Sequence, residues 1–401
     1  MGFHLIFKVW KFNQFRDLFF AGFINSIARW FEVLSFSIIA WNFTKDASIV
    51  GLLITFRLFS LALTGLFFSF TGTMFSGRSV MIFFTFLCSL SFLITSILTI
   101  LNIDIILYGL FILSSLSGAL WSVDFSFRRR MLADTLPKNL LSTGVSIDVL
   151  SSHATRLIGP LMGGITLSIL KYEFILLLLC IFYLLSLLFL LPHKDKFHLK
   201  NENSISLSFK EVINESIQNR NLLIVIILTP IFNIFALPFL ALIGILLIEK
   251  FQNNTLEIGF YTSIEGFGAL LGGLIISAFP PNKKSLFFCI MLFILLLSII
   301  LSSILNHIIL FLIFIFSFGF STACYSALQS TIIYLHSSTK LRSSTFSLLT
   351  IGIGSGAVGS MNISWMSGFL NTQNLSFIMG LEGLILFCII NLLLYYKNDR
   401  A

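Results

Sequence analysis

Several charged side chains lie inside stretches of this sequence that are otherwise apolar. Arg29 and Glu32 share one such stretch, Arg57 lies in the next, and Arg156 lies in a later one. A charge at bilayer depth destabilises a membrane protein unless it faces a partner or water, so charges of this kind mark a polar pathway. Their chemistry would be ion pairing, recognition of polar ligands and exchange of protons.

Helix geometry brings the first of these groups together. Asn25, Arg29 and Glu32 are spaced four and three residues apart, so they share one helix face, on which Arg29 can pair with Glu32. Arg57 is expected at a similar depth on the next helix. We therefore expect Arg29, Glu32 and Arg57 to form a cluster on a substrate or proton pathway. The alternative is an ionic network that only fixes helix packing.

The second half of the chain carries its own candidates. Glu265 lies eight residues into an apolar stretch without Lys or Arg, so it is the carboxylate that we expect to carry protons. Tyr325 and Gln329 are four residues apart on a later stretch, and we expect them to share a face that lines a cavity. The aromatic rings of Phe31 and Phe36 are expected to add apolar wall to that cavity.

Arg156 is followed by small and helix-bending residues. These are Gly159, Pro160, Gly163 and Gly164. Glycines allow a facing helix to approach closely, and proline permits a bend, which suits a helix that rocks against the other half of the molecule. Tight packing without movement is the alternative.

Two further acids, Asp124 and Asp148, lie near predicted helix ends beside the basic run 128–130. Charges near helix ends reach water easily. We therefore expect these acids either in a gate or in solvated ion pairs.

The composition indicates which solvent surrounds all these groups. Hydrophobic residues make up 57% of the 401 residues and charged residues only 10%, which is more apolar surface than one soluble core buries. Stretches of about 20 apolar residues, the helical length that crosses a bilayer, recur from end to end. Since backbone groups in lipid must be satisfied within the segment and no stretch alternates like a barrel strand, an all-α membrane protein is predicted. Twelve transmembrane helices are expected, at 17–42, 49–71, 79–100, 105–127, 141–169, 173–192, 221–247, 257–279, 285–305, 308–335, 344–369 and 374–396.

A polar segment divides these helices into two sets. Residues 193–220 are charged, so we expect two six-helix halves, 1–192 and 221–401, joined by a cytoplasmic linker with a short interfacial helix. Nineteen of the 25 Lys and Arg residues fall on the side of the N-terminus, and both termini are therefore expected in the cytoplasm. In the second half, Pro230 and Pro238 are expected to interrupt their helix.

Several other functions find no support in the sequence. It contains no glycine-rich phosphate loop, so ATP is not expected as the energy source, and neither an enzyme activity nor a cofactor is indicated. No His cluster has the spacing of a metal site, and the five cysteines lie on different stretches, so neither a metal nor disulfides are expected. The basic residues are scattered over short loops, which argues against nucleic acid as a partner.

Two runs resemble a known family. They are FRDLFFAGFINSIARWFEVLSFSIIAWNFTKDASIVGLLITFRLF, at 15–59, and RRRMLADTLPKNLLSTGVSIDVLSSHATRLIGPLMGGI, at 128–165. They resemble the branch of the major facilitator superfamily that contains enterobactin exporters and macrolide efflux pumps. In the second half only the helix count and the glycine-rich eighth and eleventh helices match. The resemblance implies the major facilitator fold, and its Gly-Pro-x-x-Gly-Gly element on helix five, associated with antiporters, favours export.

Another element of that family is altered in this chain. The loop between helices two and three normally reads Gly-x-x-x-Asp-Arg-x-Gly-Arg-Arg and forms a charged latch. Here the matching stretch, SFTGTMFSGR, has Ser69, Thr73 and Met74 at the Gly, Asp and first Arg positions and keeps only Arg78. The acidic partner of the latch is missing, which allows for a specialised or degenerate transporter.

These features predict a proton-coupled exporter of a small amphiphilic organic molecule, either a siderophore or a drug-like compound. We expect it in the bacterial inner membrane as a monomer, with its substrate, protons and the lipid bilayer as its partners. One alternative is a proton-coupled importer of a siderophore or nutrient. The other is a membrane sensor or assembly partner that has lost transport.

Overall fold

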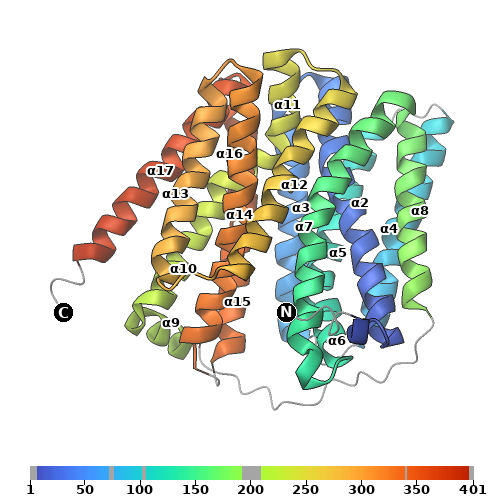
Figure 1. The fold of residues 1–401 in the computed structure, drawn as a ribbon. Coiled ribbons are helices and arrows are strands. Elements are labelled where there is room, and N and C mark those ends of the chain that lie inside the picture. The colour runs from blue at the N-terminus through green and yellow to red at the C-terminus, as the bar shows by residue number, and fades with distance from the viewer. Residues whose placement is uncertain (1–6, 72–75, 102–104, 192–208, 339–340, 397–401) are drawn as a thin grey trace. The chain divides into compact units, whose positions relative to one another are not determined.

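The computed structural model describes residues 7–71, 76–101, 105–191, 209–338 and 341–396. Every regular element in these ranges is a helix, as Figure 1 shows. The latch positions Thr73 and Met74, and the greater part of the predicted linker, lie outside the described residues.

The helices follow the order of the predicted stretches. The first six stretches form α2 (Asn13–Thr44), α3 (Ala47–Thr71), α4 (Gly77–Ile100), α5 (Ile106–Val123) continued by η1 (Asp124–Arg128) and α6 (Arg129–Asp134), α7 (Lys138–Ile169) and α8 (Tyr172–Leu190). The short α9 (Phe209–Gln218) lies in the predicted linker. The last six stretches form α10 (Arg220–Ile231) with η2 (Phe232–Ala236) and α11 (Phe239–Phe251), α12 (Thr255–Ala278), α13 (Lys284–Ile304), α14 (Ile308–His336), α15 (Arg342–Gly354) with α16 (Gly356–Met366), and α17 (Thr372–Tyr396).

Ten helical segments in the described ranges are long and apolar enough to cross a membrane. The other two predicted stretches are α7 and the pair α15 and α16. Helix α7 carries Asp148, His153 and Arg156, which lower its hydropathy, and the eleventh stretch is broken between Gly354 and Gly356. The predicted all-α fold is confirmed, and the order of the elements agrees with twelve spans.

Two of the predicted spans contain a single π-helical turn. In the fourth span η1 covers Asp124–Arg128, and in the seventh η2 covers Phe232–Ala236 between Pro230 and Pro238. The break predicted from these prolines is therefore present. Because π turns often occur at functional sites, the charged turn η1 is of particular interest.

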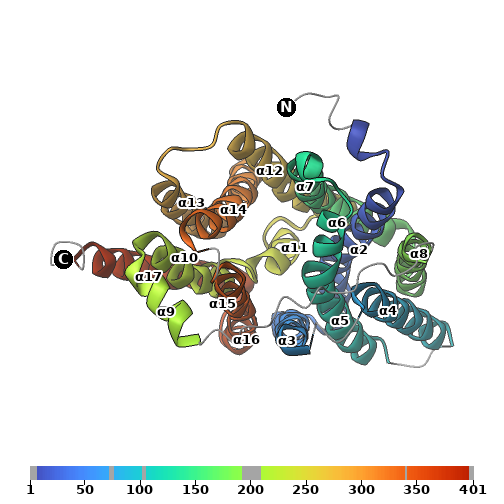
Figure 2. The same cartoon turned by 90° about the horizontal axis from the view of Figure 1, so that it is seen from below.

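The chain forms two compact units by its internal contacts. The first consists of residues 1–39 and 56–203, and the second of residues 40–55 and 204–401. In the first unit α4 packs between α5 and α8, and in the second α14 packs between α12 and α13 (Figure 2).

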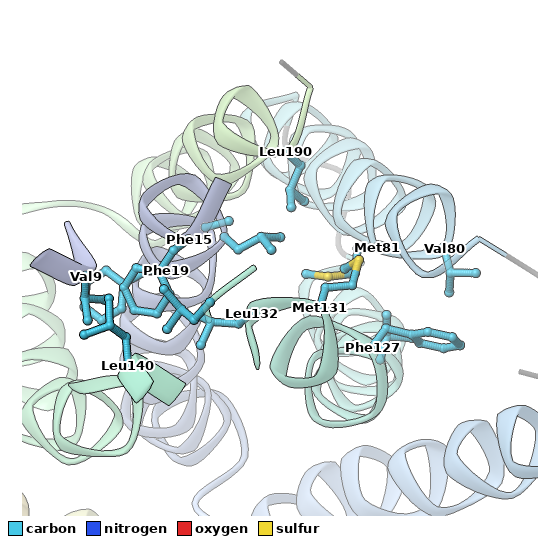
Figure 3. Packing of buried hydrophobic residues seen from close by; sticks show 14 residues of the cluster. Val9, Phe15, Phe19, Val80, Met81, Phe127, Met131, Leu132, Leu140 and Leu190 are labelled. Atoms are coloured by element: carbon cyan, nitrogen blue, oxygen red, sulfur yellow. The ribbon is translucent and has the colours of Figure 1, made fainter. Parts of the chain in front are cut away.

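An apolar cluster fixes the helices of the first unit at one end. Phe15 and Phe19 of α2, Met131 and Leu132 of α6, and Leu190 of α8 are among its buried members (Figure 3). Burying such side chains stabilises the unit by roughly 1.5–3 kcal/mol each. The cluster joins the helices that carry the buried charges described next.

Candidate functional site

Glu32 is fully buried in the first unit and is bound by side chains from two other helices. Arg57 Nη2, from α3, lies 2.8 Å from Glu32 Oε2. Tyr183, from α8, donates its hydroxyl to Glu32 Oε1, and Arg57 Nη1 also donates to the Arg29 carbonyl at 3.4 Å. The structure thus brings Glu32 and Arg57 together. Tyr183 was not identified from the sequence, because a single tyrosine in an apolar stretch looks like an ordinary core residue.

Close helix contact sets the position of Arg57. A Cβ atom on Gly118 of α5 would lie 2.0 Å from the Arg57 carbonyl oxygen, so only glycine permits this approach. The same contact recurs in the second unit, where a Cβ on Gly319 of α14 would lie 1.9 Å from the Glu265 carbonyl oxygen. Arg57 and Glu265 are each the eleventh residue of their helix, α3 and α12. They therefore occupy corresponding places in the two units.

A second set of charged side chains in the first unit forms a row of ion pairs in which positive and negative groups alternate. Arg128 holds both of its acids, Asp124 through Nε and Asp148 through Nη1, the latter at 2.7 Å. At one end of this row Arg29 Nη2 lies 3.8 Å from Asp124, and at the other end Arg129 Nε lies 3.8 Å from Asp148. These five residues are named here the arginine network, which contains three cations and two anions: Arg29, Arg128, Arg129, Asp124 and Asp148.

This network corrects two predictions. Arg29 was expected to pair with Glu32, but its ion pair is with Asp124, because Arg57 and Tyr183 occupy the two oxygens of Glu32. Solvated ion pairs were one of two expectations for the acids near the helix ends. That expectation is wrong, since Asp124 is 2% exposed and Asp148 is 6% exposed. The four-residue spacing of Asp124 and Arg128 was a signal that could have revealed their pairing.

Arg156 and the glycines after it pack against α2. The Arg156 guanidinium lies 4.8 Å from the centre of the Trp30 ring. A Cβ on Gly159 would lie 2.4 Å from the Trp30 Cβ, and a Cβ on Gly163 would lie 3.3 Å from Phe31.

The hydroxyls of Ser26 and Thr155 are 2.7 Å apart and extend this contact by one turn. Pro160 and Gly164 are buried on α7. The small residues Thr155, Gly159 and Gly163 are spaced by four and form the stripe through which α7 approaches α2.

In the second unit Tyr325 and Gln329 share a face of α14, as predicted, and that face contacts α10. Gln329 Nε2 lies 2.6 Å from the Thr229 hydroxyl, and the Tyr325 hydroxyl lies 3.4 Å from the Leu228 carbonyl. The Tyr325 ring is 1% exposed.

The aromatic residues predicted to line a cavity are buried in both units. Tyr325 stacks between Phe232 and Phe288, with ring centres 4.8 and 4.4 Å away. In the first unit Phe31 is fully buried and Phe36 is 3% exposed. Their lining of a substrate cavity stays a prediction.

Asn25 differs from the other predicted residues in its bonding. It is 2% exposed, yet neither Nδ2 nor Oδ1 of its amide has a hydrogen-bond partner among the described residues. It lies one turn before Arg29 on α2. A buried amide of this kind points to a ligand, because buried polar groups are nearly always bonded.

Within the described ranges, no group of three or more His, Cys, Asp or Glu residues is placed to hold a metal ion. The buried charges are matched mainly with one another. Such an arrangement can exchange protons, change ion-pair partners or bind a charged group of a substrate.

Comparison with known proteins adds a family match. The sequence model described as Major Facilitator Superfamily matches residues 18–361. No curated protein sequence matches the chain.

Solved structures of transporters resemble this one at low sequence identity. A POT family transporter in complex with 5-aminolevulinic acid is 13% identical, with a TM-score of 0.75 over 94% of this chain and 95% of that one. A variant of the nucleoside transporter NupG is 11% identical, with a TM-score of 0.76 over 95% and 100%. A D-xylose-proton symporter is 14% identical, with a TM-score of 0.66 over 95% and 97%. At these identities the likeness shows the fold alone.

Proposed function

Since the chain belongs to the major facilitator superfamily, and is thus a multi-pass secondary transporter, we propose that it exports a small amphiphilic organic molecule in exchange for protons. The observation that carries this proposal is the bonding of Glu32, a fully buried carboxylate held by Arg57 and Tyr183. Its helix is long and apolar enough to cross a membrane. Ionisable side chains inside transmembrane helices typically belong to the pathway of a substrate or a proton.

The two buried glutamates have different roles in this proposal. Glu265 is 3% exposed near the middle of α12, a helix without Lys or Arg, and it carries the proton. Glu32, which is bonded to Arg57 and Tyr183, holds Arg57 in position for a polar group of the substrate. Proton binding to a buried carboxylate removes its charge, and a conformational equilibrium responds to that change if the two states expose the group differently.

Export and location rest on different observations. The close contact of α7 with α2 through Gly159 and Gly163 supports a helix that moves as part of a compact unit. The resemblance of 15–59 and 128–165 to the enterobactin exporter and macrolide efflux branch supports export of a siderophore or drug-like compound. The uneven distribution of Lys and Arg supports cytoplasmic termini in a bacterial inner membrane.

Comparison of the small molecules inside and outside cells that lack the protein tests this proposal. We expect at least one amphiphilic compound to be retained in these cells and released when the parent chain is restored. The same compound should be retained when Glu32→Gln is restored instead. Depletion inside the cells would indicate import, and identical profiles would indicate a protein that has lost transport.

A further inference from the structure

Asn25 and Arg29 lie one turn apart on one face of α2, and both are buried. Both polar atoms of the Asn25 amide are buried without a hydrogen-bond partner in the described part of the chain. Leaving a buried polar group unbonded destabilises a protein by about 1–3 kcal/mol. If Asn25 only filled space, the protein would be less stable with asparagine at this position than with leucine, which has a similar size.

Arg29 has donors that the protein itself leaves available. Its nearest acid oxygen, on Asp124, is 3.8 Å away, which is an ion pair beyond hydrogen-bonding distance. Asp124 is itself held through both oxygens by Arg128. Among the described residues no hydrogen bond from the Arg29 guanidinium is found, although the residue is only 7% exposed.

Trp121 of α5 completes the arrangement. Its ring lies 4.9 Å from the guanidinium carbon of Arg29, and its Nε1 is buried without a partner among the described residues. Arg29 and Trp121 thus bring a guanidinium and an indole N–H to one place, and the Asn25 amide lies one helical turn from Arg29 on α2. The arginine network to which Arg29 belongs has one positive charge in excess.

We propose that Asn25, Arg29 and Trp121 bind the carboxylate of an organic anion. The planar fork of a guanidinium matches the two oxygens of a carboxylate, and the amide and indole N–H groups bond the remaining lone pairs. The indole face packs against the apolar part next to the carboxylate. This inference rests on the proposed function, because it names the class of substrate that the proposed transporter would carry.

Binding of benzoate to the purified protein tests the inference without a transport assay. Benzoate presents a carboxylate on a flat ring, and benzamide has the same shape without the charge. At constant ionic strength, benzoate should bind saturably by calorimetry and raise the melting temperature, and benzamide should do neither. Equal effects of both compounds, or no saturable effect of benzoate, would overturn the inference.

Three variants locate the site. Arg29→Gln, Asn25→Leu and Trp121→Phe should each weaken benzoate binding, Arg29→Gln by at least about tenfold because a charged hydrogen bond is lost. Arg130→Gln is the matched control, since Arg130 is exposed next to the network, and it should bind benzoate like the parent.

Asn25→Leu separates binding from a structural role. Removing an unbonded amide should raise the melting temperature of the protein without benzoate while benzoate affinity falls. If Asn25→Leu instead lowered both the melting temperature and the benzoate affinity, Asn25 would have a structural role, and the inference would be contradicted. Benzoate binding without any flux would instead count against the proposed function, and flux without benzoate binding would count against this inference alone.

Discussion

Arg57 Nη2 lies 2.8 Å from Glu32 Oε2 in the interior of the first unit, although 25 residues separate the two in the sequence. Neither residue is more than 5% exposed. Replacing only one member of such a pair leaves the other charge buried without its partner, which typically destabilises a protein by about 3–5 kcal/mol.

Arg57→Leu should therefore lower the free energy of unfolding by about that amount. The double variant Arg57→Leu with Glu32→Gln should recover most of the stability, because it leaves no buried unpaired charge, and should still lack coupled transport. Unfolding of the detergent-solubilised proteins measures the first effect. A single variant as stable as the parent would show that the pair is not required for the fold of this unit.

Arg128 should be the member of the arginine network on which stability depends most. Arg128→Met leaves both Asp124 and Asp148 without their shortest ion pair, so a loss of about 3–5 kcal/mol is expected. Arg130→Met, at an exposed neighbouring position, should change stability by no more than about 0.5 kcal/mol. Equal unfolding midpoints of the two variants would contradict the assignment.

The contact between α7 and α2 predicts a graded effect of small substitutions. Gly159→Ala places a Cβ 2.4 Å from the Trp30 Cβ, so it should separate the helices and abolish flux. Gly163→Ala, with its nearest contacts at 3.3 Å, should retain transport, whereas Gly163→Leu should abolish it. Flux at equal membrane abundance is the measurement. Full activity of Gly159→Ala would mean that the close approach is dispensable.

Topology can be tested with an impermeant thiol reagent on cysteines introduced at single sites. A cysteine at Asn254, just before α12, should be labelled from outside the cell, and one at Asn203 should be labelled only after the membrane is opened. Lys and Arg concentrate on the side assigned to the cytoplasm, which is the reason for this expectation. The reverse pattern would invert the orientation.

The sequence predicted the helices well because apolar length determines them directly. Even the break in the seventh span was predictable, since Pro230 and Pro238 remove backbone donors. Contacts between distant helices were harder to predict. Arg29 shares a helix face with Glu32, and spacing alone favoured their pairing, but only the packing of η1 and α8 places Asp124 and Tyr183 beside them.

Burial was the second feature that the sequence could not reveal. Asp124 and Asp148 lie near the ends of apolar stretches, where solvation was a reasonable expectation. In the structure the π turn η1 and α6 continue the fourth span beyond Asp124, so the acid is enclosed with Arg128. The unbonded amide of Asn25 could likewise be recognised only from the packing around it.

The central claim is that a buried carboxylate couples export to protons, and transport by Glu265→Gln in reconstituted vesicles tests it most directly. The substrate is the compound that cells lacking the protein retain, and a pH gradient is imposed across the vesicle membrane, with about pH 6 on one side and about pH 8 on the other. Glu257→Gln, at the N-terminal turn of the same helix, is the matched control and should respond to the gradient like the parent. We predict that Glu265→Gln exchanges substrate without a gradient but no longer responds to one, and that Glu32→Gln also binds substrate more weakly. Gradient-driven transport by Glu265→Gln equal to that of the parent under this gradient would contradict the claim.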